Sequence, residues 1–170
     1  MEAIVLFLDV LQAKMNRGKT IPVFFTKQLE DNLIADYNAR FLKDIEISGE
    51  YYIDDSENIH FECDLHLNLE FLCALCAKPI EKNFEIEVNE TFTKIATDDG
   101  YSYSTNKVEI DQLVIDSVVL NMPYVVLCSD DCKGRCPICG IDKNVASCNC
   151  KPEQEIEQEN PFSILQSLKK

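Results

Sequence analysis

Apolar and polar residues alternate without exception along IHFECDLHLNLEF, residues 59–71. The apolar positions are Ile59, Phe61, Cys63, Leu65, Leu67, Leu69 and Phe71. A period of two places alternate side chains on opposite faces of an extended chain, so the stretch predicts a strand with one buried face. Cys63 lies on that face and is expected to be a buried, inert thiol. His60 and His66 fall on the polar face, where we expect exposed strand residues rather than metal ligands.

Two neighbouring segments extend this pattern into a sheet. IEISGEYYI (45–53) alternates in the same way and is separated from the central strand by the turn-like DDSEN, and FEIEVNETF (84–92) follows it. Together the three segments predict an antiparallel meander. The polar face carries acidic residues, namely Glu62, Asp64, Glu70, Glu85 and Glu87. This face is either a solubilising surface or a docking surface for a basic partner.

Other segments carry shorter signals. Residues 3–8 predict a strand, and residues 29–42 a short helix. QLVIDSVVLN (112–121) predicts a helix that Asp111 caps and that ends before Pro123, although its β-branched residues leave a strand as an alternative.

The last twenty residues divide into two parts. KPEQEIEQEN (151–160) is acidic and low in complexity, which indicates a solvated linker. NPFSILQSLKK (160–170) places apolar residues three apart behind an Asn-Pro helix start, which predicts an amphipathic tail helix. The helix would dock on the protein's own core or on a partner.

These patterns predict a β-rich α+β fold: an antiparallel meander sheet with a cysteine-rich zinc-binding module and a short C-terminal helix. Residues 1–44 form a loosely assigned N-terminal segment, and 45–127 form an antiparallel β core with a short helix. Residues 128–150 form a zinc-knuckle module, and 151–170 form the acidic linker and tail helix.

The charge of the chain limits its partners. The formal net charge is -14, and residues 45–99 alone carry fourteen acidic and three basic side chains. A surface this negative repels phosphate backbones at long range, which disfavours broad nucleic-acid binding and favours basic protein partners. The amino terminus has no basic leader, and no apolar run reaches the roughly 18 residues of a membrane span. We therefore expect a cytoplasmic protein with no membrane partner.

Nine cysteines are many for 170 residues, and in a reducing cytoplasm clustered cysteines bind metal more often than they form disulfides. A C-x-x-C pair falls at the predicted hairpin tip, and six more cysteines follow between positions 128 and 150. The simplest partition gives two zinc sites: Cys73, Cys76, Cys128 and Cys132 in the first, and Cys136, Cys139, Cys148 and Cys150 in the second. The alternative joins Cys73 and Cys76 to Cys136 and Cys139.

Closed sites of four thiolates leave no open position for water or substrate, so two structural Zn²⁺ ions are expected and an enzyme with a small-molecule substrate is not. Cys136-Pro-Ile-Cys139 also has the spacing of a thiol-redox motif, which keeps a thiol oxidoreductase as an alternative. Three basic residues, Lys133, Arg135 and Lys143, surround the second site. They either offset the charge of the zinc-thiolate centre or contact RNA or another partner.

The order of these features resembles the YceD family, the large ribosomal RNA subunit accumulation proteins. The resemblance runs from about residue 45 to the end and depends on LNMP (120–123), CKGRCPICG (132–140) and the closing NPFSILQSL. The family usually has arginine at the position of Leu75 and leucine at that of Arg135, so an RNA contact by the family's arginine is not transferred to this chain.

The resemblance implies a non-enzymatic ribosome biogenesis factor that supports accumulation or processing of large-subunit (23S) ribosomal RNA. Its partner would be the pre-ribosomal large subunit, through ribosomal RNA or a basic ribosomal protein. The alternative is an acidic adaptor that shields a basic ribosomal protein without contacting RNA.

Overall fold

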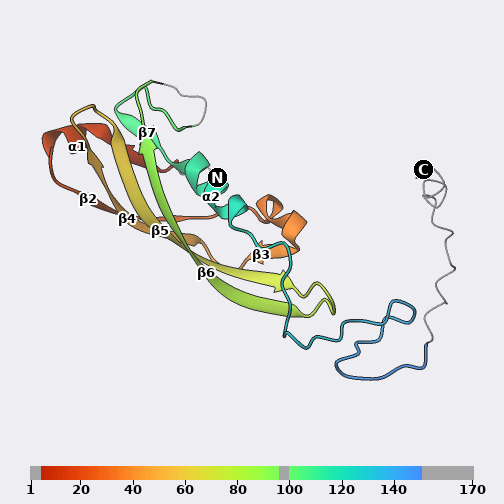
Figure 1. Ribbon diagram of the computed structural model, residues 1–170. Helices are drawn as coiled ribbons and strands as arrows, with labels where there is room; N and C mark the ends of the chain where they lie inside the picture. Colours follow the sequence, from red (N-terminus) through yellow and green to blue (C-terminus); the bar gives the residue numbers. More distant parts are fainter. Residues whose placement is uncertain (1–4, 96–99, 151–170) are drawn as a thin grey trace, which may run out of the picture.

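The structure, a computed structural model, describes residues 5–95 and 100–150. Its centre is an antiparallel sheet in which β4 (Ile45–Ile53), β5 (Ile59–Leu72) and β6 (Pro79–Phe92) follow one another as a meander (Figure 1). Ile53 pairs with Ile59 across the first turn, and Leu72 pairs with Pro79 across the second. The predicted β-rich fold with an antiparallel meander is therefore confirmed.

Two further strands complete this sheet. β2 (Ile21–Lys27) pairs with the outer edge of β4, while β3 (Ala39–Phe41) pairs with Leu69–Phe71 of β5. β3 and β4 thus occupy the same edge of β5 at different heights. The β5–β6 hairpin consequently extends past β4, toward the cysteine-rich segment (Figure 1). A small separate sheet joins β1 (Phe7–Asp9) to β7 (Lys107–Glu109).

The core lies on one face of the large sheet. The alternating apolar side chains of β5 are all buried, and they share one cluster with Tyr51 of β4 and Phe92 of β6. The helix α2 (Asp111–Leu120) contributes Leu113, Val114 and Val118 to the same cluster. The other face of the sheet, which carries the polar residues, is not covered by any of the described elements.

The N-terminal segment differs from the expected helix over 29–42. Two 3₁₀ turns, η1 (Asp31–Leu33) and η2 (Ala35–Tyr37), occupy it instead and lead into β3. Asn38 adopts a left-handed conformation with φ of 52°, which ends the turns, and the Asp31 carboxylate accepts a hydrogen bond from the Phe41 amide. These local side-chain contacts compete with a continuous helix.

The real N-terminal α-helix is α1 (Val10–Met15), which the sequence pattern did not predict. Asp9 caps it by accepting hydrogen bonds from the amides of Leu11 and Gln12. The strand expected at 3–8 is observed at Phe7–Asp9 within the described chain.

The segment 112–121 is helical, as the first of its two interpretations predicted, but Asp111 does not cap it. Ile110 is the cap residue, and the Asp111 carboxylate instead accepts a hydrogen bond from the Leu6 amide and pairs with Lys27. Asp111 therefore ties the N-terminal strands to α2.

The predicted acidic linker and tail helix lie outside the described residues. No helix within 5–95 and 100–150 is long and apolar enough to span a bilayer.

Candidate metal centres

The first pair of cysteines lies in the turn that joins β5 to β6. The Cys73 amide donates a hydrogen bond to the Lys78 carbonyl (2.9 Å), and the Ala77 amide donates to the Cys73 carbonyl (2.8 Å). Ala77 takes a left-handed φ of 57°, which lets the chain reverse within six residues. This tight turn directs Cys73 and Cys76 to the same side, where both are buried.

The chain that follows α2 brings the second pair to the same place. The Ala74 amide donates to the Val126 carbonyl at 2.9 Å, which places the segment before Cys128 beside the hairpin turn. The Sγ atoms of Cys73 and Cys132 are 3.8 Å apart, and those of Cys76 and Cys128 are 3.6 Å apart. We call this group site one.

The spacing of site one suits a tetrahedral ion. All four sulfur atoms lie within 4.8 Å of one another, and all nine cysteines of the chain are free thiols. Four sulfurs at about 2.3 Å from a tetrahedral Zn²⁺ are about 3.8 Å from each other. The four sulfurs therefore surround a space of the right size, without any covalent bond between them.

The second group, site two, is built from residues 136–150 alone. The Gly140 amide donates to the Cys136 carbonyl and the Cys136 amide to the Ile141 carbonyl, both at 2.8 Å. Gly140 has a φ of 74°, which most other residues would adopt only with strain. This turn gathers the sulfurs of Cys136, Cys139, Cys148 and Cys150 within 4.8 Å of one another. Cys136 is buried, whereas Cys139 is exposed.

The electrostatics of both groups favour a cation. In site one, burial opposes ionisation of Cys73, but backbone amides of Cys76, Cys128 and Leu75 outweigh burial and lower its pKa to about 6. In site two, the amides of Cys139 and Ile138 lower the pKa of Cys136 to about 6. One thiolate is thus ready in each group near neutral pH.

Two other thiols, Cys76 and Cys150, resist ionisation because they face other sulfurs. The Lys78 amide favours the thiolate of Cys76, yet burial and the neighbouring thiols raise its pKa to about 12. The Cys139 sulfur and burial likewise raise the pKa of Cys150 to about 12. Four thiolates so close together are stable only around a positive ion. Both groups can therefore hold a metal ion, and their donors are those that Zn²⁺ prefers.

Several contacts connecting the two sites were not predicted from the sequence. The Asn144 side chain donates from Nδ2 to the Cys132 sulfur (3.5 Å) and accepts from the Lys133 amide (2.8 Å). The Arg135 amide donates to the Leu75 carbonyl (3.0 Å), and Gly134 packs against Leu75 with a φ of 68°. A lone asparagine in a polar loop gives no sequence signal for such a role.

The basic residues near site two have different roles. Lys133 and Lys143 are exposed. Arg135 Nε donates to the Cys76 carbonyl at 2.7 Å, so its side chain links the two cysteine turns. Hydrogen bonds from Asn144 lower the pKa of Asp142, and the charges of Arg135 and Lys78 lower it further. Lys78, which the sequence analysis did not select, is exposed and close enough to Asp142 to lower its pKa. We call Lys78, Lys133 and Lys143 the basic edge.

Residues set aside by the sequence analysis are separate from both sites. Cys63 is buried, and its pKa is raised to about 12 chiefly by that burial. His60 contacts the Asp54 carboxylate (3.2 Å) and the Thr91 hydroxyl (3.0 Å) instead of sulfur. Cys136 and Cys139 lie in a turn that no helix follows up to residue 150, where the described chain ends, unlike the redox motif considered above.

The fold and these two sites define a β-rich protein with two four-cysteine groups that could hold metal ions, one shared between the β5–β6 turn and the segment after α2, the other within that segment. The chain belongs to the YceD family, described as the large ribosomal RNA subunit accumulation protein YceD, whose family model matches residues 61–169. The match covers both cysteine groups and the β5–β6 hairpin.

The curated relatives are mycobacterial. Uncharacterized proteins of Mycobacterium tuberculosis and Mycobacterium bovis are 30% identical over 77 residues, which is 41% of this chain and 37% of theirs. An uncharacterized protein of Mycobacterium leprae is 26% identical over 76 residues, 40% of this chain and 35% of its own length. The aligned part thus spans little more than a third of these relatives. No solved structure gives a significant match.

Proposed function

We propose that this chain is a non-enzymatic factor of the bacterial cytoplasm that supports accumulation or processing of 23S ribosomal RNA during large-subunit assembly. The observation that carries the proposal is the family match over residues 61–169, because it includes the hairpin, α2 and both cysteine groups. Zn²⁺ in both groups would be structural, since four sulfur donors complete its coordination and leave no position for a reacting molecule.

Contact with the pre-ribosome would use the basic edge of the cysteine module. Lys133 and Lys143 are exposed there, and Lys78 reaches the same edge from the hairpin turn. Lysine ammonium groups bind phosphate oxygens without reading base sequence. The basic edge would therefore bind the phosphate backbone of a folded RNA region rather than a particular base sequence.

Deleting the gene in its native host and measuring the ratio of 23S to 16S RNA tests this proposal. We expect the ratio to fall, to recover with the wild-type chain, and to recover incompletely with Lys133→Ala combined with Lys143→Ala. The matched control replaces two other exposed lysines, Lys19 and Lys82, with alanine and should restore the ratio fully. An unchanged ratio after deletion would contradict the proposal.

The acidic face of the sheet favours a second function, that of an adaptor for a basic ribosomal protein. Glu62, Glu85 and Glu87 are exposed on this face, where they would attract lysine and arginine and repel RNA. Affinity purification at two salt concentrations, with and without nuclease, separates the two functions. A complex that survives nuclease supports the adaptor, and a complex that nuclease dissolves supports RNA contact.

A further inference from the structure

The uncovered face of the large sheet carries charges in rows. Strand pairing places Glu50 opposite Glu62, Asp64 opposite Glu87, and Glu46 and Glu85 on either side of His66. The six carboxylates Glu46, Glu50, Glu62, Asp64, Glu85 and Glu87 therefore occupy three successive rows of β4, β5 and β6. We call this surface the acidic face.

Most carboxylates of the acidic face have no ion-pair partner within the described chain, although Lys43 lines one end of the face together with Glu46 and His66. His66 lies 4.0 Å from the Glu85 carboxylate, and the other five carboxylates have no ion pair among residues 5–95 and 100–150. Like charges directly across two strands destabilise a sheet. Two of the three rows place carboxylates directly opposite each other, so the free protein bears a cost that a cationic partner would remove.

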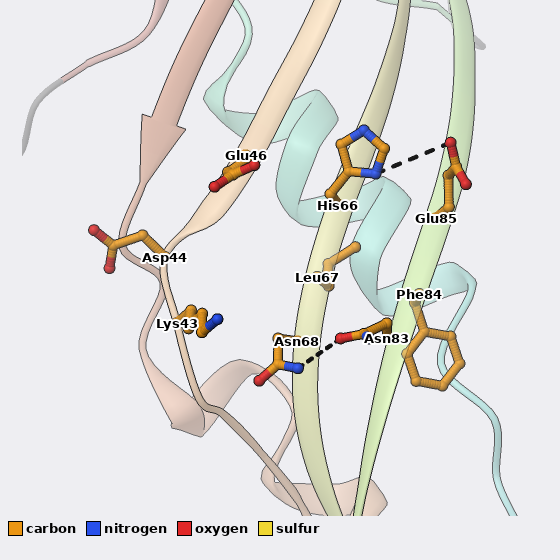
Figure 2. A pocket seen from close by; sticks show the side chains of 9 residues that line it. All are labelled: Lys43, Asp44, Glu46, His66, Leu67, Asn68, Asn83, Phe84 and Glu85. Carbon is orange, nitrogen blue, oxygen red and sulfur yellow. Dashed lines mark hydrogen bonds and ion pairs between the residues drawn. The ribbon is translucent and has the colours of Figure 1, made fainter.

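The acidic face is also hollowed. Ser48, Glu50, Glu62, Asp64 and Glu87 line a depression of about 470 Å³. A neighbouring depression measures about 360 Å³. Figure 2 shows that Glu46, His66 and Glu85, which line it, lie on the side of the sheet away from α2. The two depressions share β4, β5 and β6 and follow one another along the hairpin, which forms a shallow path in the direction of the strands.

The chemistry of this path selects its occupant. Its negative charge repels phosphate groups. It is not a metal site either, because the groups of potential metal ligands in the described chain consist only of cysteines. Alternate residues of an extended chain lie about 6.6 Å apart, which equals the spacing of successive rows on the face. That spacing is shorter than the roughly 8 Å Debye length at physiological salt, so salt does not screen neighbouring rows from one another. Their charges therefore act together on one cation-rich chain.

We propose that the acidic face binds an extended polypeptide segment with lysine or arginine at alternate positions, laid along β5 and β6. This inference rests on the adaptor function proposed above and names its binding surface. It does not depend on the cysteine sites, because none of the six carboxylates belongs to them. It can also fail while the adaptor function holds, if the basic partner binds elsewhere.

The test uses the full-length, zinc-loaded chain and a fluorescent twelve-residue peptide of alternating lysine and serine. The face variant combines Glu62→Gln, Asp64→Asn and Glu87→Gln. The control variant combines Asp36→Asn, Asp55→Asn and Asp130→Asn, which removes the same charge from residues away from the acidic face. Fluorescence anisotropy at 50 and 150 mM salt gives the affinities.

We expect the face variant to bind the peptide about tenfold more weakly, while the control variant stays within twofold of the wild type. The alternating peptide should also bind more tightly than a peptide with six consecutive lysines followed by six serines. The face variant alone should gain thermal stability at low salt, because it loses both like-charge pairs, Glu50 with Glu62 and Asp64 with Glu87, and so remains folded.

Four results would overturn the proposal. Equal losses in the face and control variants would show attraction to net charge alone. Equal affinities for the alternating and block peptides would show that the face does not select cations at alternate positions of an extended chain. Loss of affinity for a single-stranded RNA oligonucleotide in the face variant, with peptide binding unchanged, would make the face a nucleic-acid contact. A nuclease-resistant complex retained by the face variant would preserve the adaptor function while rejecting this surface.

Discussion

Replacing Cys136 with serine is expected to remove one of two zinc ions and to unfold site two while the sheet stays intact. Within residues 136–150 only Cys136 is buried, so apolar packing contributes little to the order of this segment. The turn is otherwise held by a few backbone hydrogen bonds, each worth about 1 kcal/mol net. A structural zinc ion contributes on the order of 10–16 kcal/mol of apparent binding free energy in small peptides. A bound zinc ion would therefore decide whether this segment is folded.

Elemental analysis and limited proteolysis with mass spectrometry measure this effect. We expect zinc content to fall from two ions to one per chain, and cleavage within 136–150 to become at least tenfold faster. Peptides from β4, β5 and β6 should stay protected, because their core is formed without site two.

Cys63→Ser is the matched control, since it makes the same substitution at a buried cysteine outside both groups. A hydroxyl buried without a partner costs about 1–3 kcal/mol, so this variant should unfold at lower urea concentration yet keep two zinc ions. Unchanged zinc content and proteolysis in Cys136→Ser would refute the reasoning. Zinc loss in Cys63→Ser would refute the assignment of ligands.

Three further predictions concern other parts of the molecule. Cys73→Ser should raise hydrogen exchange both in the hairpin turn and in the segment after α2, because site one joins them. Gly49→Ala should lower the free energy of unfolding by about 1–3 kcal/mol in urea titrations, since a Cβ there would overlap the Glu62 carbonyl, whereas Ser48→Ala should cost less. In the zinc-free protein, alkylation of Cys136 should titrate near pH 9, because the turn whose amides lower the pKa of Cys136 to about 6 unfolds without the ion, and the thiolate then forms only above about pH 9. A midpoint near pH 6 would show that the turn persists without zinc.

The meander was predictable because the alternation is long and separates an apolar face from a polar face. β5 keeps its alternation over the whole predicted stretch, and burial of one face fixes the strand register. The cysteine turns could also be predicted from the sequence, since C-x-x-C spacing and the glycine after Cys139 are local features. The structure groups the eight cysteines as the simplest partition had them, while zinc itself remains a prediction.

Other features depend on contacts that no local pattern reveals. α1 has six residues, fewer than two helical turns, so no repeating apolar pattern can show, and only Asp9 marks its start. β3 has three residues and exists because Leu69–Phe71 offers it a free edge of β5. The position of Cys128 beside Cys76 follows from a backbone hydrogen bond between Ala74 and Val126, formed by segments far apart in the sequence.

The two sites differ in how much of the chain must be in place before metal can enter. Site two draws its ligands from fifteen consecutive residues, whereas site one joins Cys76 to Cys128, 52 positions later, around β6, β7 and α2. Closing so long a loop before its contents are folded is entropically unfavourable. On a chain leaving the ribosome, site two should load as soon as its own turn emerges, and site one should load last. Occupancy of site one would then mark a molecule whose hairpin and helix have already come together.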